Sequence, residues 1–302
     1  MSSYEGLNVT TNVMLAQYST FRCGGPARYF AQPSSEEEIL ALLDAANNNN
    51  DEVFILGSGS NILFSDKGFD GLVIKIGKEF GEVTVEDEGD TALVKAQAGA
   101  PMATFGMKCV SNSLQGAEFI CGIPGSVGGG VYMNAGAYGG EMKNIAVSVR
   151  YIYEGEIHEI AAEDCQFGYR TSIFEKNPGM IVTGFTARLP KGDKSQIEDL
   201  VAELREKRIK SQPLDVPSAG STFKRPEGYF AGKLIEDSGL KGFALNDSGA
   251  QVSPKHAGFV VNNGGKAKAS DVMELIRYVQ DKVFADSGVH LETEVRLVGG
   301  DF

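Results

Sequence analysis

Apolar and polar residues recur with helical spacing in some parts of this chain and with strand-like spacing in others. Residues 34–47 are predicted to form a helix, because Ser34 or Ser35 can cap it, acidic residues fill its first turn, and isoleucine and leucine recur along one side. An apolar run at 52–56 predicts a short strand directly after this helix. Two further strands are predicted at 72–76, where the residues are apolar, and at 92–98, where they alternate.

Two patterns define elements in the middle of the chain. Pro101 and Gly116 bound a predicted helix at 102–114, since proline favours the first helical turn and glycine commonly follows a helix end. Strand-like alternation at 147–160 is interrupted at Glu154-Gly155, which predicts a hairpin with its turn near that pair. The mixture of helices with such strands indicates an α+β protein.

A charged segment suggests a domain connection near residues 190–210. A helix rich in charges is predicted at 195–211, directly after Pro190-Lys191-Gly192. The elements predicted on either side of it are a strand at 180–189 and helices near 230–237 and 270–285. We find no internal repeat; the length indicates two domains or three, with a boundary near 190–210.

Length and net charge exclude several classes of protein. A chain of 302 residues can form two domains with a large core. Its formal net charge of -12 argues against nonspecific nucleic-acid binding, which needs a basic surface. Small anionic ligands can still be held by a few local cations and backbone N–H groups. We also expect no membrane helix and no secretory signal, because apolar runs are short and residues 1–15 lack a basic region before an apolar one.

The cysteines and histidines are too scattered to predict a metal site. The four cysteines, which form no CxxC pair, are Cys23, Cys109, Cys121 and Cys165. This spacing favours reduced cytosolic thiols over a disulfide framework. The three histidines are equally isolated: His158, His256 and His290.

Glycine is the compositional outlier, with 38 residues that cluster in tight runs. The first run is Gly57-Ser58-Gly59-Ser60-Asn61, which follows the predicted strand at 52–56. Such a loop can turn several N–H groups toward a pyrophosphate, although it matches neither a Walker loop nor GxGxxG. A simple tight turn is the alternative interpretation.

The second glycine run is longer. It reads Gly122-Ile123-Pro124-Gly125-Ser126-Val127-Gly128-Gly129-Gly130 and leads to Met133-Asn134-Ala135-Gly136-Ala137-Tyr138-Gly139-Gly140. So many small residues permit close approach of a flat or bulky ligand, while close packing of backbone on backbone is the alternative. Two such loops in one domain favour a dinucleotide.

Ser221 is a candidate for acid–base chemistry. It lies near Lys224 and Arg225, with neither a GxSxG elbow nor a plausible His/Asp order for a triad. It could belong to a phosphate-binding turn or donate a proton. A hydroxyl is a poor acid toward oxygen or nitrogen, but its proton transfer to a carbanion-like centre is downhill.

An arginine and two carboxylates complete the candidates. Arg170 follows Tyr169 in a predicted loop, where arginine is usually a surface residue. Glu292 and Glu294 share one face of an alternating segment, and most such pairs are solvated. The residues alone therefore assign neither a catalytic role.

In their order along the chain, these motifs resemble the UDP-N-acetylenolpyruvoylglucosamine reductase (MurB) family of peptidoglycan precursor synthesis. The similarity spans almost everything from residue 20 to residue 299. The segments that carry it are 19–27, 56–61, 123–129, 133–139, 167–170, 220–226 and 292–299. No single segment is decisive, but their order is highly specific.

The resemblance implies a fold and a cofactor. It implies an FAD-binding domain of the vanillyl-alcohol-oxidase type with two α/β subdomains, assigned to residues 1–200, and a smaller α/β substrate-binding domain at 201–302. FAD would be bound, NADPH would be the co-substrate, and a UDP-sugar would be the substrate. The residues that match the FAD contacts are Gly57, Ser58, Gly59, Ser60, Asn61, Gly122, Ile123, Pro124, Gly125, Ser126, Gly128, Ala135 and Gly136.

The resemblance also implies a reaction, the reduction of UDP-N-acetylenolpyruvoylglucosamine to UDP-N-acetylmuramate. NADPH reduces the flavin, and flavin N5 then delivers hydride to the enolpyruvyl group. Ser221 matches the serine that protonates the adjacent carbon, while Arg170 and Glu294 match residues that stabilise the enolate-like intermediate. Glu294 can do so only if it is protonated or hydrogen-bonded to the intermediate, because a bare carboxylate would oppose the developing charge.

The chain departs from part of the family in two ways. Arg225 stands where many members have asparagine, and the short chain leaves little room for a flap that carries a substrate-binding tyrosine. We therefore expect the flap-less type. The candidates for gripping the uridine diphosphate are Tyr169, Lys224, Arg225, Lys233 and His256, with a solvated surface role as the alternative.

Two other functions are alternatives at this stage. One is a flavin oxidase or dehydrogenase of the same fold that acts on a small alcohol, although no histidine stands at a flavin-attachment motif. The other is a non-catalytic flavin-binding relative, which would not need Arg170, Ser221 and Glu294 together. For the enzyme we expect a cytoplasmic location, with no nucleic-acid or membrane partner and no obligate protein partner.

Overall fold

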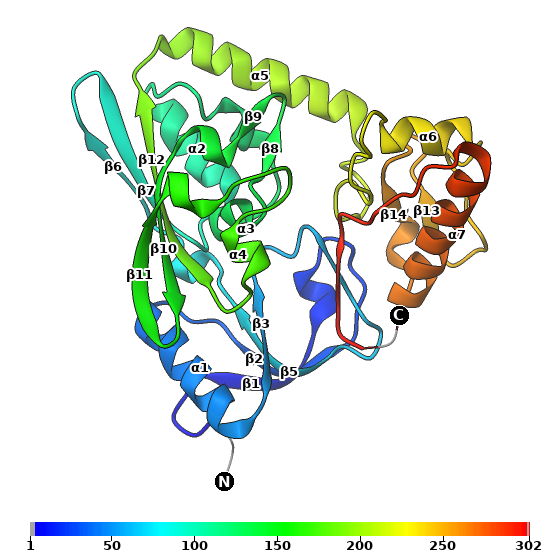
Figure 1. The fold of residues 1–302 in the computed structure, drawn as a ribbon, viewed down its shortest axis with the longest axis horizontal. Coiled ribbons are helices and arrows are strands. Elements are labelled where there is room, and N and C mark those ends of the chain that lie inside the picture. The colour runs from blue at the N-terminus through cyan, green and yellow to red at the C-terminus, as the bar shows by residue number, and fades with distance from the viewer. Residues whose placement is uncertain (1–3, 301) are drawn as a thin grey trace. The chain divides into compact units, whose positions relative to one another are not determined.

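The computed structural model describes residues 4–300 and 302, which form two compact units (Figure 1). The first unit comprises the residues up to Val9, Ala31–Ser58 and Val73–Arg208. The second unit comprises Thr10–Phe30, Gly59–Leu72 and Ile209–Phe302. Each unit is therefore assembled from separate stretches of chain. The expected assignment of a flavin domain to 1–200 and a substrate domain to 201–302 stays a prediction.

The first unit is built on a five-stranded antiparallel sheet with the order β11-β10-β12-β7-β6. Its strands are β6 (Val83–Asp87), β7 (Thr91–Gln97), β10 (Ala146–Tyr153), β11 (Glu156–Ala161) and β12 (Ile181–Pro190). One face of the sheet buries alternate residues such as Val94 and Phe185 against helices α2 (Met102–Ser111) and α3 (Val127–Tyr132). The rings of Phe105 on α2 and Phe185 lie 5.9 Å apart in this core.

Helix α1 (Glu36–Asn49) follows the rules for helix ends closely. The Ser35 hydroxyl accepts a hydrogen bond from the Glu38 N–H at 3.2 Å, and Asn50 ends the helix in the left-handed conformation. Ile39 and other apolar residues on one side are buried. Strand β3 (Glu52–Leu56) then leads to the first glycine run.

Further elements complete the first unit. They are β8 (Gly136–Ala137), β9 (Gly140–Glu141), α4 (Ile173–Lys176), most of α5 (Lys194–Ser211), and the 3-10 helices η2 (Lys78–Phe80), η3 (Glu118–Gly122), η4 (Met142–Asn144) and η5 (Ala162–Cys165). Helix α5 buries only Ile197, which agrees with its high content of charged residues. It carries the chain from the first unit into the second.

The second unit packs two helices against short strands. Its elements are η1 (Leu15–Tyr18), β4 (Ile62–Phe64), α6 (Ala231–Asp237), β13 (Ala250–Val252), β14 (Val260–Asn262), η6 (Asn263–Gly265), α7 (Ala269–Ser287) and β15 (Arg296–Val298). One side of α7, including Val272, Ile276 and Val279, forms the core of this unit. The Asp66 carboxylate accepts hydrogen bonds from the first N–H groups of α7, at Ala269 (2.7 Å) and Ser270 (3.0 Å).

A four-stranded sheet and a two-stranded sheet flank the glycine run at 57–61. Strands β1 (Val9–Met14), β2 (Pro26–Ala31), β5 (Phe69–Lys75) and β3 form a sheet in the order β1-β2-β5-β3. The unit boundaries fall within β1, β2 and β5. Strand β4, directly after the glycine run, pairs in parallel with β15. The run therefore has a strand on each side.

The structure confirms the predicted helices and most predicted strands, but one glycine-rich segment differs from expectation. Residues 122–130 were expected to form a loop, yet α3 begins within them. The Ser126 hydroxyl caps this helix by accepting from the Gly129 N–H at 3.4 Å, and a Cβ at Gly130 would lie 2.7 Å from the Met102 sulfur. Close packing thus overrides the weak helix propensity of glycine. Within the described residues, no helix is long and apolar enough to cross a membrane.

Candidate active site

The first half of the glycine run at 57–61 lies against the second glycine run. A Cβ at Gly57 would lie 2.4 Å from the Ser126 Oγ, so a side chain there would have to displace the Ser126 hydroxyl. The carbonyl of Gly57 accepts a hydrogen bond from Lys75 Nζ at 2.8 Å. The structure thus brings together two loops that the sequence analysis selected separately, both in the first unit.

The second half of the same run is fixed within the second unit. Gly59 has φ +66°, and a Cβ there would lie 1.9 Å from the Tyr18 carbonyl oxygen. The Gly59 carbonyl accepts from the Thr20 N–H at 3.1 Å. Asn61 donates from Nδ2 to the Glu294 carbonyl at 3.0 Å, and its own carbonyl accepts from the Arg296 N–H at 3.0 Å. Asn61 therefore holds the backbone of the carboxylate residue that the sequence analysis singled out.

Backbone hydrogen bonds fix the position of the second glycine run. The N–H groups of Val127 and Gly128 donate to the carbonyls of Ala100 and Ala98, each at 2.8 Å. The Ser126 side chain is buried and is used as a helix cap, whereas Gly122 and Pro124 are exposed. The exposed part of the run therefore offers backbone and small apolar groups to a ligand.

Arg170 is placed by a strained turn. It has φ +56°, which is uncommon for a residue with a side chain, and its Nη1 donates to the Gly136 carbonyl at 3.3 Å. Gly168 and Thr171 bridge across the turn. Gly136, a predicted cofactor contact, and Arg170, a predicted catalytic residue, are thus neighbours.

Asn134 secures this turn and was not selected from the sequence. It is 1% exposed, and its Nδ2 donates to the Gly168 carbonyl (2.9 Å) and to Glu141 Oε2 (2.8 Å). Its Oδ1 accepts from the Lys143 N–H at 3.0 Å. An asparagine inside a glycine-rich run was the available signal, because asparagine tolerates a positive φ better than most residues that have a Cβ, and Asn134 has φ +46°.

Replacing Asn134 with alanine should destabilise the protein by about 2–4 kcal/mol, because buried hydrogen-bonding groups lose their partner. Displacement of the turn at Arg170 should also lower kcat by about tenfold. Urea denaturation and steady-state kinetics measure the two effects. Asn47→Ala, at an exposed asparagine near the end of α1, is the control and should cost less than about 1 kcal/mol. An unchanged free energy of unfolding in Asn134→Ala would contradict the role of Asn134 in holding the turn at Arg170.

In the second unit, Ser221 and Glu294 lie on paired backbone segments. The Thr222 carbonyl accepts from the Glu294 N–H at 2.8 Å, and the Lys224 N–H donates to the Glu292 carbonyl at 2.8 Å. Phe223 and Thr293 form the bridge between these contacts. The alternating segment 291–295 makes one bridge, and its burial alternates only in part: Glu292 is exposed, whereas Thr293 and Glu294 are both half-buried.

Comparison with known proteins shows what these motifs belong to. The family model of the FAD binding domain matches residues 27–161, and that of the UDP-N-acetylenolpyruvoylglucosamine reductase C-terminal domain matches 212–298. The UDP-N-acetylenolpyruvoylglucosamine reductase of Clostridium perfringens is 46% identical over 99% of this chain and 95% of the relative. That of Agathobacter rectalis is 46% identical over 94% of this chain and 92% of the relative.

A solved structure agrees over nearly the whole fold. The crystal structure of the reductase (MurB) from Thermus caldophilus has a TM-score of 0.81 at 34% identity, and the match covers 97% of this chain and 100% of that chain. The chain belongs to the UDP-N-acetylenolpyruvoylglucosamine reductase family. Membership confirms the resemblance, the α+β fold with its FAD-binding domain, and the prediction of an FAD-dependent oxidoreductase.

The residues of this family member fit FAD. The FAD-domain match includes both glycine runs, and the missing side chain at Gly57 lets Ser126 of the second run lie close to the first. Ser58, Gly122 and Pro124 are exposed at these runs, so backbone is accessible where a bulky ligand must approach. Gly136 is adjacent to Arg170. The individual cofactor contacts assigned from the sequence stay predictions.

The residues expected to bind the uridine diphosphate differ in their interaction partners. Lys224 forms an ion pair with Glu292, and Lys233 forms one with Asp237. Arg225 stacks over the Phe230 ring at 4.0 Å. Arg225 Nε also donates to the Tyr229 carbonyl at 3.2 Å, and the Phe230 ring beside it is exposed.

His256 and Tyr169 differ from the other candidates. His256 Nδ1 accepts from the Gly258 N–H at 3.1 Å, and burial lowers the pKa of its imidazole. His256 is therefore neutral at pH 7 and would act as a hydrogen-bonding group, not as a cation. Tyr169 is 55% exposed next to Arg170, whose guanidinium lies 5.6 Å from the Tyr169 ring centre.

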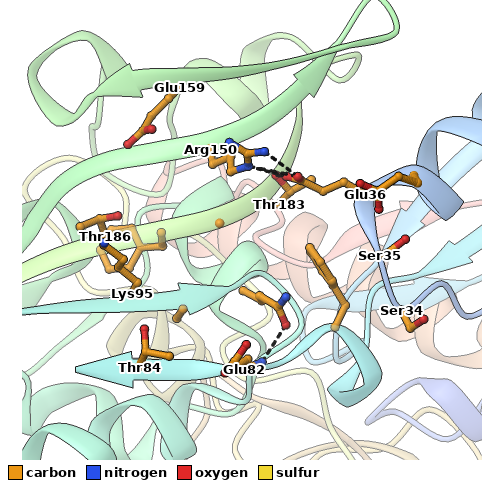
Figure 2. A pocket seen from close by; sticks show the side chains of 16 residues that line it. Ser34, Ser35, Glu36, Glu82, Thr84, Lys95, Arg150, Glu159, Thr183 and Thr186 are labelled. Atoms are coloured by element: carbon orange, nitrogen blue, oxygen red, sulfur yellow. Dashed lines mark hydrogen bonds and ion pairs between the residues drawn. The ribbon is translucent and has the colours of Figure 1, made fainter. Parts of the chain in front are cut away.

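A pocket of about 600 Å³ lies elsewhere in the first unit, between the start of α1 and the outer face of the five-stranded sheet (Figure 2). None of the predicted site residues lines it. Arg150 donates to both Glu36 oxygens at 2.8 Å, and the Thr183 hydroxyl donates to Glu36 at 2.6 Å. Burial would raise the pKa of Glu36, but these bonds outweigh it and lower the pKa. Glu36 thus ties α1 to the sheet.

Proposed function

We propose that this protein catalyses the NADPH-dependent reduction of UDP-N-acetylenolpyruvoylglucosamine to UDP-N-acetylmuramate, a step of peptidoglycan precursor synthesis. Bound FAD supplies the hydride transfer. The observation that carries the proposal is the pairing of 222–224 with 292–294, which puts Ser221 and Glu294 on adjacent backbone in a chain of this family.

Ser221 is the proton donor in this proposal. It is half-buried and directly precedes Thr222, whose carbonyl is bonded to the Glu294 N–H. Hydride addition to the enolpyruvyl methylene leaves negative charge on the adjacent carbon of the substrate. A serine hydroxyl can protonate such a carbon without a lowered pKa, because the carbon is far more basic than the alkoxide that results.

Arg170 and Glu294 stabilise the charge on the substrate. The guanidinium can meet the substrate carboxylate with charge-assisted hydrogen bonds. Glu294 acts as a hydrogen-bonding partner of the enolate-like oxygen, and for this it must carry a proton when it contacts that oxygen. Asn61, which holds the Glu294 carbonyl, fixes the position of its backbone.

The thiols are consistent with the cytoplasmic location that we propose. All four cysteines are free, and burial raises the pKa of Cys23 and Cys109 to about 12 and that of Cys121 and Cys165 to about 11. Such thiols stay protonated and unreactive at neutral pH. Cysteines that form no disulfide are typical of proteins in a reducing compartment.

The test is a spectrum followed by two rate measurements. The purified protein should show the absorbance of bound flavin, and NADPH oxidation should accelerate on addition of UDP-N-acetylenolpyruvoylglucosamine, with one product formed for each NADPH consumed. UDP-N-acetylglucosamine, which lacks the enolpyruvyl group, is the control and should cause no acceleration. A yellow protein that oxidises NADPH at the same rate with either compound would contradict the proposed substrate.

A further inference from the structure

Lys75 makes a contact with the first glycine run that the function described above does not use. It is the last residue of β5, and Ile76 follows it. The Ile76 N–H donates to the Leu56 carbonyl at 2.9 Å, and Lys75 Nζ donates to the Gly57 carbonyl at 2.8 Å. Two consecutive carbonyls at the end of β3 are therefore held by two consecutive residues, Lys75 and Ile76, at the end of β5.

The ammonium group of Lys75 is confined. The residue is half-buried, and burial lowers its pKa while nearby Glu79 opposes that effect. A Cβ at Gly77 would lie 3.8 Å from Lys75 Nζ and 3.1 Å from Glu79 Oε2, so both groups lie beside the Gly77 backbone. A charged donor in such surroundings forms a stronger hydrogen bond than a neutral one.

This bond sets the direction of one peptide group. In a trans peptide the carbonyl and the following N–H point to opposite sides of the chain. With the Gly57 carbonyl directed to Lys75, the Ser58 N–H is directed away from it. Gly57 is a glycine and would otherwise rotate easily about its backbone bonds.

We propose that Lys75 is a positioning residue for the FAD diphosphate. By holding the Gly57 carbonyl, it presents the Ser58 N–H to the diphosphate, and it places a positive charge behind the same peptide group. This inference rests on the proposed location of the diphosphate at 57–61. Lys75 itself does not touch the cofactor.

The experiment measures the dissociation constant of FAD by titrating apoprotein and following flavin fluorescence. Lys75→Met should weaken FAD binding by about tenfold or more, since a charge-assisted bond is lost and the peptide is released. Lys75→Arg, which keeps charge and donors, should stay within about threefold. Lys95→Met is the matched control, because Lys95 on β7 pairs with exposed Glu86. Its FAD affinity should not change.

Two additional probes separate a diphosphate effect from general damage. ADP contains the diphosphate without the flavin, and riboflavin contains the flavin without phosphate. Lys75→Met should weaken ADP binding by the same factor as FAD binding and leave riboflavin binding unchanged. Equal weakening of FAD and riboflavin, or a lowered melting temperature without weaker ADP binding, would overturn the proposal.

Gly57→Ala distinguishes failure of this inference from failure of the proposed diphosphate location. If Gly57→Ala weakens ADP binding while Lys75→Met leaves it unchanged, Lys75 has no positioning role, and the loop assignment stands. If neither variant changes ADP binding, the diphosphate lies elsewhere, and both proposals fall together. The positioning role is supported if ADP binding is weaker in both Gly57→Ala and Lys75→Met. The FAD dissociation constants of Lys75→Arg and Lys95→Met should then stay close to that of the wild type.

Discussion

Ser221→Ala is expected to lower product formation by about a thousandfold, within the range that general acid catalysis contributes, while flavin reduction by NADPH stays within about twofold of wild type. The substitution removes the hydroxyl and leaves the backbone pairing of Thr222 with Glu294 in place. Stopped-flow absorbance at the flavin band measures reduction, and quantification of UDP-N-acetylmuramate measures the second half of the reaction.

The two half-reactions make this result diagnostic. Loss of both rates would indicate damage to the flavin site, and the proton-donor role would then not explain the defect. Full product turnover in Ser221→Ala would show that another group protonates the carbon. Ser218→Ala, a half-buried serine in the same segment, serves as the control and should keep both rates.

Arg170→Met is expected to reduce kcat by about a hundredfold or more, because the developing charge on the substrate loses its cationic partner. Arg170→Lys should recover only part of the rate, since an ammonium cannot form the paired hydrogen bonds of a guanidinium. Both variants place a side chain at the same left-handed position, so backbone strain is common to them. Steady-state kinetics at saturating substrate gives the comparison.

The dissociation constant of FAD must be measured alongside these rates, because Arg170 also contacts the Gly136 carbonyl. The dissociation constant of FAD in Arg170→Met should stay within about threefold of the wild-type value if the substitution impairs the chemical step and not cofactor binding. Arg188→Met is the control, since Arg188 pairs with Glu88 at the surface and such pairs contribute little. A kcat within threefold of wild type in Arg170→Met would contradict the catalytic role.

The elements that the sequence predicted best are those whose start, end or turn is marked by residues within the element itself. Helix α1 has a serine cap, acidic first turn and apolar side, and the structure shows all three. The β10–β11 hairpin turns at Glu154 and Gly155, both with positive φ, as the interruption of the alternation suggested. In both cases the information lies within about fifteen consecutive residues, so no distant partner was needed.

Other features depend on residues far apart in the sequence. Strands β4 and β15 pair although more than two hundred residues separate them, and each is only three residues long. The first N–H groups of α7 donate to Asp66, about two hundred residues earlier. Helix α3 forms although glycine disfavours a helix, and a Cβ at Gly128 or Gly130 would lie within 2.8 Å of Ala98 or Met102. None of these contacts has a local pattern that could reveal it.

The candidate site likewise combines features that a local sequence pattern reveals with contacts between residues far apart in the sequence. The residues alone selected the glycine runs as ligand loops, while the roles of Arg170, Ser221 and Glu294 came from the family resemblance. What the structure adds is the supporting contacts: Asn134 behind the Arg170 turn and Asn61 behind Glu294. These contacts depend on buried geometry, which a pattern of residue types does not encode.

The buried cysteines give the molecule a set of internal reporters. Cys23 belongs to the second unit, and Cys109 and Cys165 belong to the first. A thiol of this kind reacts with a labelling reagent only after the structure around it opens, so its rate of modification follows the local opening equilibrium. Timed alkylation with mass spectrometry can therefore follow the opening of each unit separately in the unmodified wild-type chain.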